Sequence, residues 1–229
     1  MQLSGRRREI FDLLCKRRSM TVAELAGILY VSEMTVRRDL SALEQHGFVT
    51  RYRGGAVART EGMLPLSERM HLEEDEKRGL SEKAAAHLAD GMTVFVDFSS
   101  TCQFILPHLK KYSGITLITN SVKTLLSAEA LKLPCHLLGG DYCEKEMCLL
   151  GPAAERAADA VNVDIAFFSV QGYDTDGTLS DSVLEAVTFR ERIIKNAAHT
   201  VFLFERAKCG RRYRYTLAPA EGRRLTVIL

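Results

Sequence analysis

The first sixty residues carry the feature that most constrains the fold, a succession of short amphipathic segments separated by turn signals. Apolar residues recur at helical spacing over residues 5–17. Thr21 and Glu24 then have the spacing of a capping box at the start of a second helix, and Ser32 is placed to cap a third helix that Gly47 ends. Three short helices, the last two joined by a tight turn, predict a helix-turn-helix.

A short strand and a sharp turn follow the third helix. Residues 48–53 alternate like a strand and Gly54-Gly55 permits a reversal, which predicts a wing that carries Arg51 and Arg53 toward a DNA backbone. The third helix would lie in the major groove, where its polar first turns reach base edges and phosphates. The alternative is a small helical core with no DNA role. The candidate DNA-binding residues are Thr21, Ser32, Glu33, Thr35, Arg37, Arg38, Arg51 and Arg53.

The net charge of +2 conceals an asymmetry between the two parts of the chain. Residues 1–60 contain 11 basic and 6 acidic residues, a net charge of +5, whereas the remainder contains 20 basic and 23 acidic residues, a net charge of −3. A basic N-terminal part followed by a mildly acidic remainder is suited to binding a nucleic-acid phosphate backbone through the N-terminal part. Charge alone is equally consistent with a basic solvated surface.

The segment TVAELAGILYVSEMTVRRDLSALEQHGFVTRYRGGAV, residues 21–57, resembles the DNA-binding domain of the DeoR family of bacterial regulators. That family has a recognition helix of the pattern Ser-x-x-Thr-hydrophobic-Arg-Arg-Asp-Leu, followed by Leu-Glu and then by Arg-x-x-Gly-Gly-Ala. Tyr52-Arg53 departs from the usual hydrophobic residue and histidine, although Arg53 keeps a cation there. The matching residues are Ser32, Thr35, Val36, Arg37, Arg38, Asp39, Leu40, Leu43, Glu44, Arg51, Gly54, Gly55 and Ala56.

Beyond Gly91, short apolar runs alternate with helical stretches, which predicts an α/β domain with a largely parallel sheet. The acidic residues 73–76 are either a solvated segment or the start of a helix that continues from Lys77 to Gly91. The predicted strands are 93–96, 115–118, 136–138, 164–169 and 200–204, and the predicted helices are 102–111, 122–130, 153–161 and 182–196. The predicted domains are a winged helix-turn-helix at 1–57, a linker at 58–76, and an α/β effector-sensing and oligomerisation domain at 77–229.

Small and polar residues follow the predicted strands. Ligands of such sheets lie beyond the carboxyl ends of the strands, and hydroxyls with backbone N–H groups at a helix N-terminus bind phosphate. Each of these segments alone is more often a plain turn or a helix cap than a ligand site, but five of them at one sheet predict a shared effector site. The candidate effector-binding residues are Asp97, Ser99, Ser100, Thr101, Thr119, Asn120, Gly139, Gly140, Gly172 and Lys208.

This region also resembles the effector domain of the DeoR family, which is similar in fold to ribose-5-phosphate isomerase and senses a phosphorylated sugar or related metabolite. Residues 97–102 correspond to the family loop Asp-x-Gly-Ser-Thr-Thr, and Thr119-Asn120 and Gly139-Gly140 correspond to its Thr-Asn and Gly-Gly. The resemblance also implies that the chain, ending at Leu229, lacks the family's last sheet-edge element. Further matches are Arg69, Lys77, Gly151, Asp164, Gly172, Gly177, Glu185-Ala186, Arg190 and Lys208, and departures that predict altered phosphate binding are Phe98, Ser99, Cys102, Phe189 and Glu205.

The resemblance implies a DeoR-type regulator, a homo-oligomer that represses carbohydrate-metabolism genes by binding double-stranded operator DNA under the control of a small-molecule effector. Repression and activation are not distinguished by sequence. One alternative is isomerase-like catalysis by Asp97, Glu205 and Lys208, and another is an α/β domain that only oligomerises. We expect a cytoplasmic protein that is not an enzyme and needs no cofactor. No membrane span is expected because the apolar runs are short. No metal site is expected because Cys143 and Cys148 lack a second ligand pair.

Overall fold

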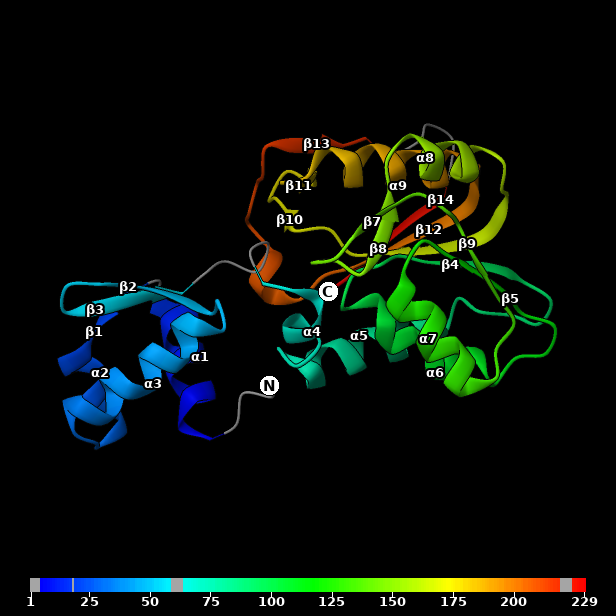
Figure 1. Ribbon diagram of the computed structural model, residues 1–229. Coiled ribbons are helices and arrows are strands. Elements are labelled where there is room, and N and C mark those ends of the chain that lie inside the picture. The colour runs from blue at the N-terminus through cyan, green and yellow to red at the C-terminus, as the bar shows by residue number, and fades with distance from the viewer. Residues whose placement is uncertain (1–4, 18, 59–63, 219–223) are drawn as a thin grey trace. The chain divides into compact units, whose positions relative to one another are not determined.

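The computed structural model describes residues 5–17, 19–58, 64–218 and 224–229 (Figure 1). The chain divides into two compact units, residues 1–71 and residues 72–229. Within the described ranges, no helix has the length and apolar character needed to cross a membrane. The two units are considered separately below, because each has its own buried core.

The first unit is a winged helix-turn-helix, as the sequence predicts. Three helices accompany a three-stranded antiparallel sheet, in which β3 lies between β1 and β2 and whose first strand, β1, comes between the first two helices in the chain. Apolar side chains from all three helices are buried, and the rings of Phe11 and Phe48 meet edge to face at 5.2 Å. The elements are α1 (Arg6–Arg17), β1 (Ser19–Thr21), α2 (Val22–Leu29), α3 (Glu33–Gln45), β2 (Val49–Tyr52), β3 (Gly55–Ala58) and the one-turn helix α4 (Leu66–Arg69).

Local sequence signals determine where these helices begin. Thr21 accepts a hydrogen bond from the Glu24 backbone while the Glu24 carboxylate accepts from the Thr21 backbone, so the predicted capping box is present. Ser32 caps α3 in the same manner by accepting from the backbone N–H of Thr35. The turn between α2 and α3 passes through Tyr30, whose φ of 52° is unusual for a bulky side chain.

The second unit is an α/β domain built on a six-stranded sheet of order β14-β12-β9-β4-β5-β6, in which every neighbouring pair is parallel. The fold class predicted from the strand–helix alternation is therefore confirmed. The strands are β4 (Thr93–Val96), β5 (Thr116–Thr119), β6 (Cys135–Leu137), β9 (Val163–Phe168), β12 (Ala197–Leu203) and β14 (Arg224–Ile228).

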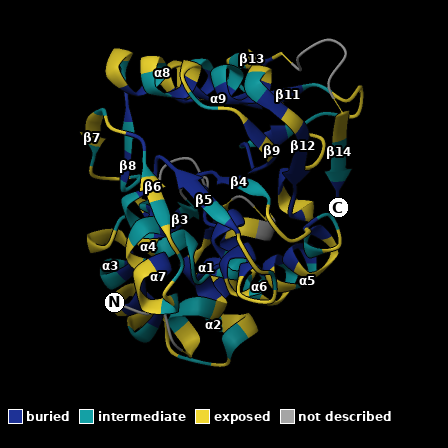
Figure 2. Ribbon diagram, turned by 90° about the vertical axis from the view of Figure 1, so that its right-hand side faces the viewer, coloured by how far each residue is buried: buried dark blue, intermediate teal, exposed yellow. Residues whose placement is uncertain are grey.

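Both faces of this sheet are covered by helices (Figures 1 and 2). Successive side chains of a strand point to opposite faces, so Phe95 packs in one core with α8 and α9 while its neighbours Val94 and Val96 pack in another with α5, α6 and α7. The helices are α5 (Glu74–Ala85), the 3-10 turn η2 (Cys102–Ile105), α6 (Leu106–Leu109), α7 (Val122–Leu131), α8 (Pro152–Asp159) and α9 (Leu184–Asn196).

Several elements differ from the sequence prediction. Residues 66–69 form a short helix inside the predicted linker, residues 74–76 belong to α5 in agreement with the helix-start alternative for the acidic run, and the helix predicted to reach Gly91 ends at Ala85. The sequence pattern does not predict the strands β1, β3 and β14. It also does not predict the short additional elements of the second unit, which are β7 (Asp141–Cys143), β8 (Cys148–Leu150), β10 (Gly172–Tyr173), β11 (Leu179–Asp181), η3 (Arg206–Lys208) and β13 (Tyr215–Leu217).

Candidate DNA interface and effector site

The exposed side of α3 carries the charged residues that the sequence assigns to DNA. Arg37 and Arg38 are exposed, and Arg37 Nη2 lies 2.7 Å from Glu33 Oε2 one helical turn earlier. This ion pair keeps an anionic acceptor and a cationic donor side by side on the first turns of the helix, where base edges are read in such domains. Thr35 is half-buried and its hydroxyl lies 2.9 Å from the Ser32 hydroxyl.

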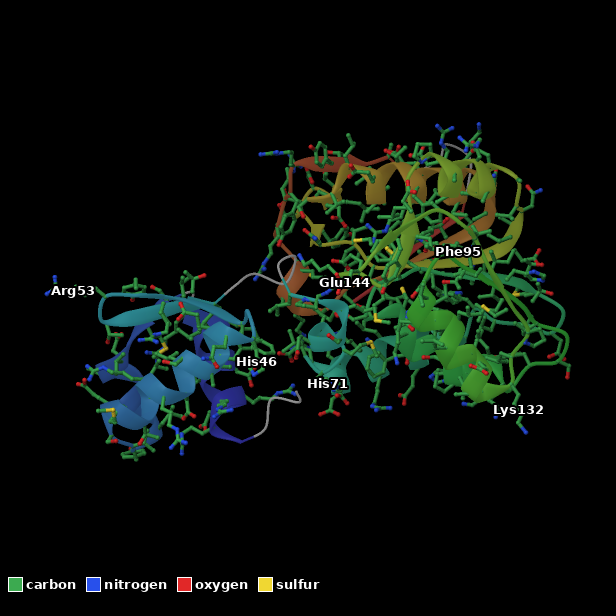
Figure 3. The ribbon with its side chains drawn as sticks, in the orientation of Figure 1. His46, Arg53, His71, Phe95, Lys132 and Glu144 are labelled. Atoms are coloured by element: carbon green, nitrogen blue, oxygen red, sulfur yellow. The ribbon has the colours of Figure 1, made fainter. Side chains whose placement is uncertain are left out.

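The wing is joined to α3 by Arg51. Its guanidinium donates to Ser41 at 2.6 Å, and its backbone N–H donates to the carboxylate of Glu44 at 2.9 Å. Arg53 is exposed at the tip of the wing, where its side chain points away from the sheet (Figure 3). Of the two wing arginines, Arg51 thus positions the wing, and Arg53 extends from its tip.

Three residues outside the predicted set also shape this face. Asp39 is buried and accepts hydrogen bonds from Arg6 at 2.6 Å and Arg7 at 3.1 Å, which fixes α1 against α3. Met34 and Tyr30 leave 72% and 95% of their surface exposed, although both are large apolar side chains. Met34 lies on the first turn of α3, on the outward side of the helix that the sequence pattern predicts, and Tyr30 lies in the turn before this helix.

The loop after β4, residues 97–101, is buried and is organised by one arginine of α9. Arg190 donates to the carboxylate of Asp97 from Nε at 3.3 Å and from Nη2 at 3.0 Å, and from Nη1 to Asp181 at 2.7 Å. Its guanidinium also lies 4.6 Å from the centroid of the Phe98 ring. Burial raises the pKa of Asp97, and the facing guanidinium opposes that shift. Asp97 therefore anchors the loop through the oxygen that faces Arg190.

A second buried cluster joins this loop to the end of β12. Lys208 Nζ lies 2.7 Å from Glu205 Oε2, and Lys77 Nζ lies 3.7 Å from Glu205 Oε1. Thr101 donates to Glu205 at 2.7 Å, and Lys208 donates to Ser169 at 2.9 Å. Burial favours the neutral acid, but Lys208 and Lys77 outweigh it and lower the pKa of Glu205 to about 2. Two ammonium groups therefore share one ionised carboxylate at the strand ends.

The segment after β5 is held by internal hydrogen bonds. The Thr119 hydroxyl donates to the carbonyl of Val96 at 2.6 Å, and the Asn120 side-chain amide donates to the carbonyl of Leu149 at 3.0 Å. Ser121 caps α7 by accepting from the backbone of Thr124 at 3.1 Å. Thr119 and Asn120 are predicted ligand contacts, and the structure gives the Thr119 hydroxyl and the Asn120 amide nitrogen internal partners.

Buried oxygens that accept no hydrogen bond from the described residues lie at three neighbouring strand ends. They are Asp97 Oδ1, Asn120 Oδ1 and Gln171 Oε1, which follow β4, β5 and β9 respectively. Buried polar groups are almost always hydrogen-bonded in native proteins, so these acceptors indicate a position for donors from outside the protein. Gln171 was not predicted, because its role depends on strand order rather than on a local motif.

The three glycines predicted to approach a ligand have different surroundings. A Cβ on Gly140 would lie 2.6 Å from the Leu150 carbonyl, and one on Gly172 would lie 2.5 Å from the Arg211 carbonyl. A Cβ on Gly139 would meet nothing within 4 Å. Close approach of the protein's own backbone thus accounts for Gly140 and Gly172, and only Gly139 has open space beside it.

All five departures from the family pattern lie in the protein interior. Phe189 is fully buried, with its ring centroid 6.1 Å from that of Phe95, so this position supplies packing rather than a cation. Cys102 is fully buried, and burial raises the pKa of its thiol, which keeps it neutral. Ser99 accepts a hydrogen bond from the Cys102 backbone at 3.3 Å and so retains a turn in this loop. Among the residues that the structure describes, no cluster of three His, Cys, Asp or Glu side chains could hold a metal ion.

A winged helix-turn-helix with exposed arginines, followed by a parallel α/β domain, defines a DNA-binding transcriptional regulator with a separate sensor domain. Two family models match these two parts of the chain. The DeoR-like helix-turn-helix domain matches residues 6–61, and the DeoR C terminal sensor domain matches residues 72–228. The chain therefore belongs to the DeoR family of transcriptional regulators.

Similar proteins span nearly the whole chain. The HTH-type transcriptional regulator YulB of Bacillus subtilis (strain 168) is 31% identical, over 93% of this chain and 83% of that protein. The glycerol-3-phosphate regulon repressor of Escherichia coli (strain K12) is 26% identical, over 92% of this chain and 84% of that protein. Among solved structures, ribose 5-phosphate isomerase A of Methanocaldococcus jannaschii aligns with a TM-score of 0.44 and 20% identity, over 59% of this chain and 54% of that chain.

Proposed function

We propose that this regulator is a cytoplasmic homo-oligomeric repressor of carbohydrate-metabolism genes, and that a phosphorylated sugar or related metabolite in the sensor domain changes its affinity for operator DNA. Relatives named for a glycerol-3-phosphate regulon and for a lactose phosphotransferase system support the metabolic role. Control of DNA affinity by the metabolite requires that it bind one conformation of the protein better than the other, with a typical coupling of about 1–3 kcal/mol.

The chemistry at the strand ends is the observation that carries the proposed ligand class. Lys77 and Lys208 provide cations around Glu205, beside the hydroxyl of Thr101, and a phosphate would compete with the carboxylate for these donors. Asp97 Oδ1 and Asn120 Oδ1 would accept hydrogen bonds from the hydroxyl groups of a sugar. A small molecule that combines a phosphate with several hydroxyls matches both halves of this environment.

The same contacts favour sensing over catalysis, without cofactor or metal. An isomerase-like mechanism would need a carboxylate free to exchange protons near neutral pH. Glu205 faces two lysines that lower its pKa to about 2, so it stays ionised near neutral pH, and the Asp97 oxygen that faces Arg190 is held in that ion pair. We therefore infer that Asp97 and Glu205 organise the site and that this protein is not an enzyme.

On the DNA side, we propose that Arg37 reads a base edge and that Arg38 contacts a phosphate. Arg37→Ala should weaken operator binding by about 1–3 kcal/mol and relax sequence preference at one position. Arg38→Ala should weaken binding to all sequences alike and reduce the salt slope of log K by about 0.9 for one phosphate contact. The measurement is a salt titration of binding to a duplex selected from a random library with the wild-type protein.

The matched control is Arg192→Ala, which removes a half-buried arginine from α9 of the sensor domain. Its salt slope and sequence preference should equal those of the wild type. Unchanged DNA affinity in both α3 variants would reject α3 as the recognition helix. An equal loss in the Arg192 variant would show that the charge effect is general rather than local.

A further inference from the structure

The β7–β8 hairpin places two cysteines directly opposite each other. In its antiparallel register Asp141 faces Leu150 and Cys143 faces Cys148, next to the turn. Residues directly opposed in such a pair have Cα atoms about 4.5–5.5 Å apart and side chains on the same face. A disulfide needs a Cα separation of about 4.4–6.8 Å, so the backbone already provides the required spacing.

The two thiols share one environment but differ in access. Cys148 is fully buried in the core that includes Leu150 and Phe98, and Cys143 is half-buried against the same core. Both side chains therefore point toward the same interior, and Cys143 is the one that a small oxidant reaches first. Burial raises the pKa of Cys148, which keeps this partner a neutral thiol.

We propose that Cys143 and Cys148 form an oxidisable pair that a hydroperoxide closes into a disulfide. In the first step the Cys143 sulfur takes an oxygen atom from the peroxide, giving a sulfenic acid and the corresponding alcohol or water. In the second step the Cys148 sulfur attacks the sulfenic sulfur, and the hydroxyl leaves with the Cys148 proton as water. Two thiols are thereby oxidised by two electrons in all, and the peroxide is reduced by the same number.

The hairpin is joined to the candidate effector site by backbone hydrogen bonds. Val122 N–H donates to the Met147 carbonyl at 2.8 Å, Leu149 N–H donates to the Asn120 carbonyl at 2.8 Å, and the Asn120 side chain donates to the Leu149 carbonyl. A crosslink between Cys143 and Cys148 would remove the freedom of β8 to separate from β7. Oxidation therefore restrains the strand against which Asn120 is held.

The test uses the full-length protein with Cys15→Ser and Cys209→Ser, because these two cysteines are exposed and would otherwise form intermolecular disulfides. After treatment with hydrogen peroxide, peptide mass spectrometry should show residues 143 and 148 linked with the loss of two hydrogen atoms, and dithiothreitol should reverse the change. Cys102 serves as an internal control, because it is buried in η2 and faces no cysteine across a strand pair, and it should remain a thiol.

Two further readouts separate the parts of the proposal. Cys143→Ser, a conservative change at the half-buried position, should abolish the crosslink while the protein remains folded by circular dichroism. Hydrogen exchange at Val122 and Leu149 should be slower in the oxidised than in the reduced protein. Free thiols at both positions after peroxide treatment would overturn the site, and a crosslink without slower exchange would overturn its link to Asn120.

Discussion

The carboxylate of Glu205 shows how a single buried residue is stabilised by partners distant in sequence. Its side chain has no exposed surface, and burial alone would favour the protonated form. Lys208 is three residues away in the chain, but Lys77 and Thr101 come from α5 and from the loop after β4. The local sequence places one of these partners beside Glu205, and only the fold brings the other two.

The lowered pKa of Glu205 predicts a defined pH dependence of stability. Its folded value of about 2 lies below the ordinary value of 4.5, so its contribution is fully present above about pH 4.5 and is lost as the pH falls toward 2. The shift corresponds to about 3 kcal/mol. Glu205→Gln should lower the urea-measured stability of the sensor domain at pH 7, and the gap from the wild type should narrow as the pH falls below 4.5.

The control is Glu129→Gln on the exposed surface of α7, which should leave stability nearly unchanged at every pH. A constant gap between wild type and Glu205→Gln from pH 7 to pH 3 would show that ionisation of this carboxylate does not stabilise the fold. In that case the loss would come from packing or hydrogen bonding alone.

At the scale of elements, sequence periodicity was sufficient for those with a long or repeated pattern. The helices of the winged domain follow from caps at Thr21 and Ser32, and the sheet strands follow from apolar runs such as residues 93–96. Strands of two or three residues, such as β7 and β10, are too short for a period-two pattern to stand out. Contacts such as Arg190 with Asp97 join residues 93 positions apart, and no local pattern reports them.

The junction between β6, β7 and α8 provides a test of why Gly139-Gly140 is present. A Cβ on Gly140 would lie 2.6 Å from the Leu150 carbonyl and 2.7 Å from Ala154 Cβ, so Gly140→Ala should force the hairpin away from α8 at a cost of about 1–3 kcal/mol. Gly139→Ala meets nothing within 4 Å and should cost much less. Thermal unfolding of the two variants provides the comparison. Equal losses would show that this close contact does not determine the requirement for glycine at position 140.

At the scale of the whole molecule, charge and function are divided between the two units. Residues 1–60 carry a net charge of +5 and the remaining residues carry −3, so the attraction for a phosphate backbone is concentrated where the recognition helix lies. The proposed ligand instead meets buried cations and acceptors of the second unit. Regulation therefore requires that binding in one unit change the binding free energy in the other.

Thermodynamic linkage makes this coupling measurable from both sides. If a phosphorylated sugar changes operator affinity by some factor, the operator must change the affinity for that sugar by the same factor, about 5–150-fold for typical couplings. A panel that includes glycerol 3-phosphate and hexose phosphates would first be screened by shifts in melting temperature. The strongest binder would then be titrated with and without the selected DNA duplex, and the DNA with and without the sugar phosphate.

Two variants separate the two binding events. Lys208→Met should weaken sugar-phosphate binding while DNA affinity without ligand is retained. Arg38→Ala should weaken DNA binding but preserve the coupling factor, because Arg38 lies outside the sensor domain. A bound sugar phosphate that leaves DNA affinity unchanged would refute control of this regulator by that ligand, and the absence of binding by the whole panel would favour a sensor domain that serves only to assemble the protein.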